Sequence, residues 1–230
     1  MKIFSLTCTR AGELSNTTTD LLEYFKRCNI QSKLLVDKSS IFTAYDEGID
    51  ELHADHDDII ILCHDDIRIL TDPTVFTTIL KEKLSKSDVG FIGVAGTTIL
   101  SKSGIWWDQE FWQKGKHSGC VIHGLDLVNP DDTYFGKLGQ VSVLDGVFLA
   151  TTKKTLRSIQ LTKPSMFEGS WDFYDIFYTI QTHLKKKKNF TVPIQIMHES
   201  RGELVGRDSW HKNRQAFCAI FKDHLPTSVS

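Results

Sequence analysis

The stretch DHDDIIILCHDD, from Asp55 to Asp66, constrains the fold more than any other part of the chain. Its five apolar residues, Ile59 to Cys63, run directly into the polar triplet His64-Asp65-Asp66. This run is too short for a helix and is mostly β-branched, which is typical of a strand buried on both faces. Because ligands of open α/β sheets bind at the carboxyl ends of strands, we expect a metal or phosphate site at the triplet.

The rest of the chain alternates between strand and helix patterns. This alternation indicates an α/β fold, a single Rossmann-like domain with a mostly parallel central sheet flanked by helices. No glycine motif of a dinucleotide site or a P-loop follows any predicted strand, which argues against both. Strands are predicted at residues 2–9, 32–37, 59–63, 88–97, 140–153 (as a pair or a bulged strand) and 191–198, and helices at 16–28, 41–52, 73–86 and 170–188.

One long segment, residues 101–132, has no clear period and is expected to form a loop or subdomain. It carries Trp106, Trp107 and Trp112. Aromatic side chains there could stack on a sugar ring or pack beneath the loop. The residues after Pro226 are expected to fray.

Composition excludes several classes of protein. The chain of 230 residues has 40% hydrophobic and 24% charged residues and a formal net charge of −2, which gives no support for a nucleic-acid partner. No stretch approaches the roughly 18 apolar residues that span a bilayer, and the amino-terminal apolar run is too short for a secretory signal. The five cysteines are scattered and odd in number, so we expect free thiols and a cytoplasmic location.

Polar clusters occur at predicted strand ends or helix starts. Two adjacent carboxylates and a distant histidine are suited to Mn²⁺ or Mg²⁺, which take carboxylate and phosphate oxygens as ligands. The clusters are residues 37–40 (DKSS), 64–66 (HDD), 172–175 (DFYD) and 198–199 (HE).

A set of motifs over roughly residues 2–220 resembles a known family. The chain is similar to GT-A-fold glycosyltransferases of the family 2 type, in particular to a small branch related to streptomycin-biosynthesis glycosyltransferase-like proteins. The resemblance implies one domain over residues 1–225, with a nucleotide-binding half (1–100), an acceptor-binding half (101–225) and a tail (226–230). The motifs are, in order, SLTCTR, SSIFTAYDEGID, IIILCHDDIRI, GFIGVAGT, VSVLDGVFLA, DFYDIF and IQIMHESRG.

The resemblance also implies a donor site. Asp65 and Asp66 would hold the Mn²⁺ or Mg²⁺ ion, and His198 would complete its shell or touch the diphosphate. Arg201, with Arg207, could close over the diphosphate. The residues implied to contact the nucleotide-sugar are Thr7, Thr9, Arg10, Asp37, Ser39, Asp65, Asp145 and Arg201.

The implied acceptor site contains Asp145, Trp106 and Trp171. Asp175 would be the general base, with Asp172 as the alternative, since an acceptor hydroxyl must lose its proton as the new bond forms. An in-line attack with one base inverts the anomeric carbon and needs no enzyme nucleophile.

The chain departs from the family pattern at two places. The metal motif is usually Asp-x-Asp, and counting back from Asp65 puts Cys63 at its first position. Phe177 stands where relatives often have a second acidic residue, and Asp172 where some have histidine. The strength of metal dependence and the choice of base therefore stay open.

We expect a metal-assisted, inverting glycosyltransferase (a hexosyltransferase) with a nucleotide-sugar donor and a glycan, lipid-linked or protein-linked acceptor. UDP is the first expectation for the donor nucleotide, with dTDP and GDP as alternatives. A lipid-linked acceptor would allow peripheral contact with a membrane. The competing hypotheses are a metal-dependent phosphoesterase or nucleotidyltransferase, and an inactive GT-A-like module that binds nucleotide-sugars.

Overall fold

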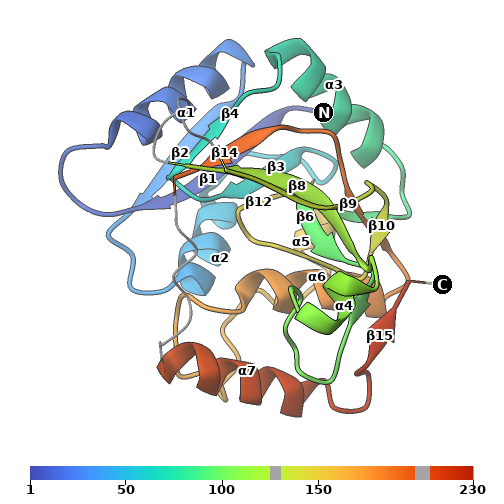
Figure 1. Cartoon of the computed structure of the whole chain (residues 1–230). Coiled ribbons are helices and arrows are strands. Elements are labelled where there is room, and N and C mark those ends of the chain that lie inside the picture. Colours follow the sequence, from blue (N-terminus) through green and yellow to red (C-terminus); the bar gives the residue numbers. More distant parts are fainter. Residues whose placement is uncertain (125–130, 200–207, 230) are drawn as a thin grey trace.

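The fold is built on a seven-stranded central sheet (Figure 1). The computed structural model describes residues 1–124, 131–199 and 208–229. The apolar run Ile59–Cys63 forms β3, and all five of its residues are buried. The strands of this sheet are β1 (Ile3–Thr9), β2 (Gln31–Val36), β3 (Ile59–Cys63), β5 (Val89–Gly93), β10 (Gln140–Val141), β12 (Phe148–Thr152) and β13 (Lys188–Thr191).

The central sheet is mixed. Its order is β10-β13-β5-β12-β3-β1-β2. The pairs β1–β2, β1–β3 and β5–β13 are parallel, whereas β12 is antiparallel to β3 and β5, and β10 to β13. Five strands (β1, β2, β3, β5, β13) therefore share one direction and two oppose it. The predicted α/β class is confirmed, with a mixed rather than wholly parallel sheet.

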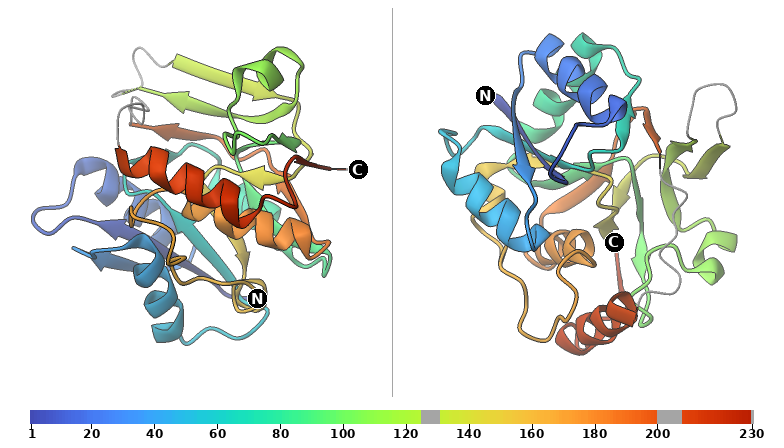
Figure 2. Two further views of the ribbon diagram at one scale, coloured as in Figure 1. Left: turned by 90° about the horizontal axis from the view of Figure 1, so that it is seen from below. Right: turned by 90° about the vertical axis from the view of Figure 1, so that its left-hand side faces the viewer.

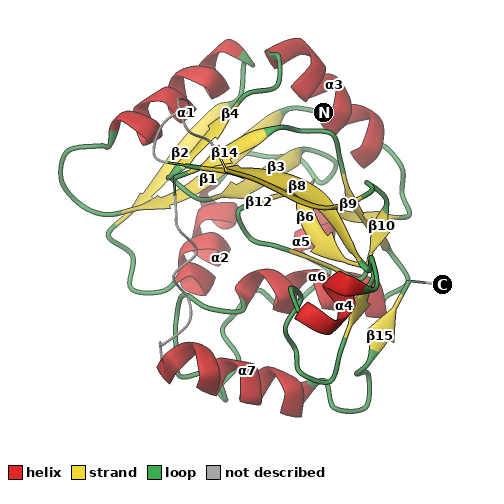
Figure 3. Cartoon of the chain, in the orientation of Figure 1, coloured by secondary structure: helices red, strands yellow, loops and turns green. Residues whose placement is uncertain are grey.

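Helices cover both faces of this sheet (Figure 3). On one face, Tyr24 of α1 packs edge-to-face on Phe76 of α3, with ring centroids 5.5 Å apart. On the other, Phe42 of α2 packs on Tyr178 of α6 at 5.8 Å. The helices are α1 (Asn16–Arg27), α2 (Ile41–Glu51), α3 (Pro73–Leu84), α4 (Gln109–Gln113), α5 (Lys153–Leu156), α6 (Tyr174–Leu184) and α7 (Asp208–Ile220).

A second sheet corrects the expectation for residues 101–132. Part of that segment forms β8, which pairs antiparallel with β9, and Figure 2 shows this ribbon beside the central sheet. Pairing between strands leaves no periodic signal within residues 101–132 themselves. The sheet has the order β11-β6-β8-β14-β4, with β9 on β8, and its strands are β4 (Ile67–Ile69), β6 (Ala95–Thr97), β8 (His117–His123), β9 (Asp131–Gly136), β11 (Val143–Leu144) and β14 (Ile196–His198).

Two further expectations are wrong in detail, and one helix was not foreseen. The helix predicted over residues 170–188 is shorter, because α6 begins at Tyr174 and ends at Leu184, and the four lysines at 185–188 lead into β13. Helix α7 was not predicted. The expected frayed end forms β15 (Thr227–Ser228), which pairs with β7 (Ile99–Leu100).

Candidate active site

The site forms where β3 and β14 end beside the loop between β11 and β12. Because β12 is antiparallel to β3, the residues that precede it lie at the edge where β3 ends, and Phe148 pairs with Cys63. The His64 amide accordingly donates to the Val147 carbonyl at 3.3 Å. His198 is the last residue of β14. The amide of the next residue, Glu199, donates a hydrogen bond to the Asp66 carbonyl at 2.9 Å.

Three side chains converge at this edge. Asp66 Oδ1 lies 3.2 Å from His198 Nε2 and 3.7 Å from His64 Nδ1. The two imidazole nitrogens are 3.5 Å apart. Two imidazoles and one carboxylate therefore present ligand atoms to one point.

The converging atoms fit a divalent ion. Asp66 Oδ1 is buried and makes no well-aligned hydrogen bond within the described residues, although His198 Nε2 lies 3.2 Å away; a cation would satisfy this oxygen. Ion-to-ligand bonds of about 2.1 Å place neighbouring ligands roughly 3.0–3.4 Å apart, close to the separations between these three residues.

The electrostatics of the cluster also suit a metal. Burial raises the pKa of a carboxyl, but at Asp66 the facing His198 and His64 outweigh it and hold the pKa below its usual value. Burial and His198 lower the pKa of His64. Both shifts favour the forms that bind metals, an ionised carboxylate and a neutral imidazole.

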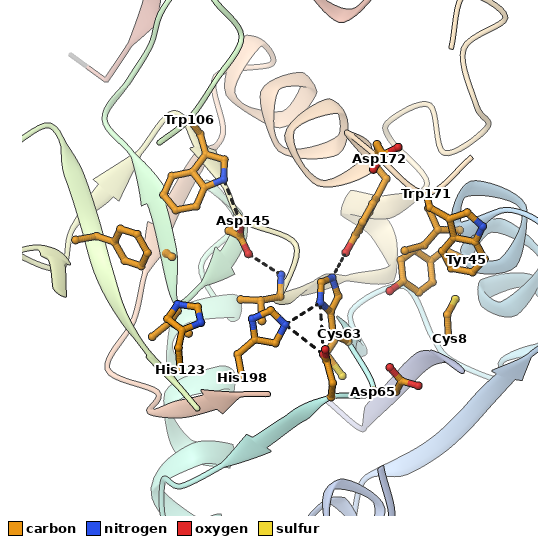
Figure 4. Close-up of a pocket in the computed structure, with 18 residues that line it drawn as sticks. Cys8, Tyr45, Cys63, Asp65, Trp106, His123, Asp145, Trp171, Asp172 and His198 are labelled. Carbon is orange, nitrogen blue, oxygen red and sulfur yellow. Dashed lines mark hydrogen bonds and ion pairs between the residues drawn. The ribbon is translucent and has the colours of Figure 1, made fainter. Parts of the chain in front are cut away.

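A pair of carboxylates, Asp145 and Asp175, lies near this cluster. Asp175, in the first turn of α6, accepts a hydrogen bond from the Gly146 amide at 2.8 Å. Asp145 accepts from Trp106 Nε1 at 3.1 Å and from the Val147 amide at 2.9 Å (Figure 4). Burial and the Asp145 charge raise the pKa of Asp175 to about 7. Such a carboxylate can exchange a proton near neutral pH.

The residue before α6 is strained. Phe173 has a φ of 67°, a left-handed conformation that is uncommon outside glycine. Its ring packs on Trp210 and Phe217 of α7, with centroids 5.2 and 5.7 Å away. Asp172, on the other side of this kink, accepts a hydrogen bond from Ser209 of α7 at 3.2 Å.

Three adjoining cavities share Trp171 and Asp172. The largest, about 940 Å³, extends to Thr9, Arg10 and Asp37 at the ends of β1 and β2. A cavity of about 420 Å³ is lined by Asp145, Trp106 and the cluster of His64, Asp66 and His198, called the metal-type cluster below. A small one of about 110 Å³ lies against Asp175 and is also lined by Trp107 and Trp210. Figure 4 shows Trp106 and Asp145 on one side of the middle cavity and Trp171 and Asp172 on the other.

The structure brings most predicted site residues to these cavities, with exceptions. The buried Thr7 has its hydroxyl 3.3 Å from Cys63 Sγ, and neither Thr7 nor Ser39 lines any of these three cavities. Asp65 lines two cavities but is outside the metal-type cluster. The predicted Arg201, like Arg207, lies outside the described residues.

The two predicted acceptor tryptophans differ in exposure, although both line the cavity of about 420 Å³. Trp171 is 43% exposed and lines all three cavities, whereas Trp106 is buried and bonded to Asp145. Trp107 was one of the three tryptophans considered for stacking on a sugar, whereas Trp210 was not foreseen at the site; their ring centroids are 5.7 Å apart.

His64 is the metal-type residue that sequence reasoning missed. The signal available in the sequence was its place in the polar triplet directly after β3, next to Asp65 and Asp66. In the structure His64 and Asp66 meet in the cluster with His198, whereas Asp65 is outside it. Counting from Asp66 makes the motif His-x-Asp, and Cys63, whose thiol pKa is raised to about 12 by burial, has no place in it.

Within the described residues, no helix is long and apolar enough to cross a membrane.

Comparisons with solved structures show the fold. GalNAc-T7, in a crystal structure with UDP, GalNAc and Mn²⁺, matches with a TM-score of 0.59 and 12% identity. The match covers 97% of this chain and 49% of GalNAc-T7, so this chain spans about half of that protein's length. The crystal structure of A197 from STIV matches with a TM-score of 0.51 and 10% identity, over 87% of this chain and 86% of A197.

Sequence comparison adds the family. No curated protein sequence matches this chain. A family profile described as "Glycosyltransferase like family" matches residues 13–219, nearly the whole chain. With a mixed α/β domain consistent with the GT-A fold, this chain belongs to the glycosyltransferase-like family.

Proposed function

We propose that this protein is a metal-assisted, inverting glycosyltransferase that moves a hexose from a nucleotide-sugar to a carbohydrate-bearing acceptor. The observation that carries the proposal is the placement of the His64, Asp66 and His198 cluster between two spaces. On one side is the cavity of about 940 Å³, and on the other the Asp175 carboxylate with its small cavity.

The large cavity suits the donor nucleotide. Its walls offer Asp37 for the hydroxyl groups of a ribose or the edge of a base, and the cation Arg10 for phosphate. UDP is the first candidate, which is supported by the UDP in the GalNAc-T7 structure. The narrower placement in the branch of streptomycin-biosynthesis-like proteins is a prediction that rests on the sequence motifs alone.

His64, Asp66 and His198 would hold the ion. When bound, it would supply positive charge to the leaving diphosphate as a Lewis acid. Imidazole ligands suit Mn²⁺ better than Mg²⁺, which prefers oxygen ligands. We therefore favour Mn²⁺ of the two predicted ions.

Asp175 is the proposed base. Its raised pKa leaves it largely ionised just above neutral pH while keeping it basic enough to take a proton. Asp172, which accepts a hydrogen bond from Ser209, is the alternative base.

The walls around Asp175 suit a sugar acceptor. The exposed ring of Trp171, with Trp107 and Trp210, can pack on the apolar face of a pyranose while its hydroxyls point to carboxylates. The acceptor sugar could belong to a free glycan, a lipid-linked glycan or a glycosylated protein.

Calorimetric titration with UDP, dTDP and GDP tests the proposal. Each is titrated with Mn²⁺, with Mg²⁺ and with EDTA, and we expect UDP to bind most tightly with Mn²⁺. Binding of none of the three would contradict the donor site. Release of phosphate from simple phosphoesters without an acceptor would favour the phosphoesterase hypothesis, and tight UDP-sugar binding with no transfer to a panel of glycans would favour the inactive module.

A further inference from the structure

Tyr174 connects the metal-type cluster to the base. Its ring is buried at the start of α6, and its hydroxyl lies 2.9 Å from the Gly146 carbonyl and 3.2 Å from His64 Nε2. The His64 nitrogen that faces Asp66 and His198 is the other one, Nδ1.

Counting protons assigns each of these bonds. A carbonyl oxygen only accepts, so the single proton of the Tyr174 hydroxyl goes to Gly146. Toward His64 the hydroxyl can then only accept, and His64 Nε2 must carry the ring proton. A neutral imidazole has one such proton, which leaves the Nδ1 lone pair free and directed at the cluster.

We propose that Tyr174 is a positioning residue that fixes His64 in the Nε2–H form and so presents Nδ1 as a ligand to the divalent ion. Partners of this kind on metal-binding histidines set ring orientation and tautomer, and their loss weakens metal binding about 10–100-fold. The inference rests on the metal site of the proposed function.

Gly146 extends the connection to Asp175. The Gly146 carbonyl accepts a hydrogen bond from Tyr174, and the Gly146 amide donates one to Asp175. One glycine therefore orients both Tyr174, which holds the metal ligand His64, and the base Asp175. A Cβ at this position would lie 2.3 Å from the Tyr174 hydroxyl and 2.9 Å from Asp175 Cβ, so only glycine allows this approach.

The test is Mn²⁺ affinity, measured by calorimetry on the full chain without nucleotide. Tyr174→Phe removes only the hydroxyl, and we expect the affinity for Mn²⁺ to fall about 10–100-fold. Tyr178→Phe is the matched control: Tyr178 is another buried tyrosine of α6, its hydroxyl donates to the Leu161 carbonyl at 2.8 Å, and it lines none of the three cavities. We expect this variant to bind Mn²⁺ like the wild type.

The outcomes separate the two proposals. If the wild type binds no Mn²⁺, the metal site of the proposed function is wrong. If the wild type binds Mn²⁺ and the Tyr174→Phe and Tyr178→Phe variants match it, only the role of Tyr174 is wrong.

A second measurement needs no change to Tyr174 and covers the case in which Tyr174→Phe fails to fold. Long-range ¹H–¹⁵N NMR of the metal-free wild type at pH 8 reads the tautomer of each histidine, and His64→Gln assigns the His64 signal by its disappearance. We expect the proton on Nε2. A proton on Nδ1 of His64 would overturn the proposal.

Discussion

Two carboxylates of the candidate site lie in contrasting surroundings. Asp66 faces two imidazoles, and they hold its pKa below the usual value in spite of its burial. Asp175 faces another carboxylate, Asp145, and burial together with that charge raises its pKa to about 7. The same chemical group is therefore suited to two tasks because its neighbours differ. Asp66 stays ionised and can bind a cation, whereas Asp175 can exchange a proton as a base.

The strongest test of this contrast removes the ionisable oxygen of Asp175. Asp175→Asn keeps an oxygen to accept from the Gly146 amide but cannot take a proton, so we expect kcat to fall about 10²–10⁴-fold. UDP-sugar binding should stay unchanged in calorimetry. Asp172→Asn is the control, and a larger loss of kcat in that variant would transfer the role of base to Asp172.

The next test acts on the other carboxylate. Asp66→Asn replaces a charged ligand by a neutral one, and we expect Mn²⁺ affinity to fall on the order of 10²-fold. Asp65→Asn changes the neighbouring residue outside the cluster and should reduce the affinity for Mn²⁺ alone much less. Equal losses in both variants would mean that the ion binds between the two carboxylates instead.

The pH dependence of turnover should report the ionisation of Asp175. Only ionised Asp175 can accept the acceptor's proton, so kcat at saturating Mn²⁺ should rise about tenfold per pH unit below 7 and level off above it. Asp145→Asn removes the like charge and should move this limb to lower pH, although burial, the larger cause, remains. A flat profile between pH 5 and 8 would exclude Asp175 as the titrating base.

The smallest expected effect is on stability. Because the folded-state pKa of Asp175 is raised, the folded chain binds this proton more tightly than the unfolded chain between about pH 4 and 7. Stability is therefore lost as pH rises through this window, and ionised Asp175 is destabilising at pH 8. Asp175→Asn should raise Tm at pH 8 by at least about 2 °C and by less at pH 5. A lower Tm at both values would show that the carboxylate is stabilising where it lies.

Local patterns in the sequence were sufficient for much of the framework. The buried run of β3 and the amphipathic helices α1, α2 and α3 were predicted within a few residues, because each pattern lies within one element. The position of His64, Asp65 and Asp66 at a strand end followed from the same reasoning. The missed helix α7 packs on Phe173, and the missed strand β8 pairs with β6 and β14, so both depend on partners elsewhere in the chain.

The sequence by itself determined the fold class, the strand end that carries the polar triplet and the inventory of chemically able side chains, since short-range periodicity encodes burial and element type. Only the tertiary structure decided which of them meet. His198 reaches His64 across 134 residues through the pairing of β14, and Asp145 reaches Asp175 through the reversed strand β12 and the close approach at Gly146. Strand order, direction and register depend on contacts between distant segments, and these contacts, rather than any local motif, set both the cluster geometry and the two opposite pKa shifts.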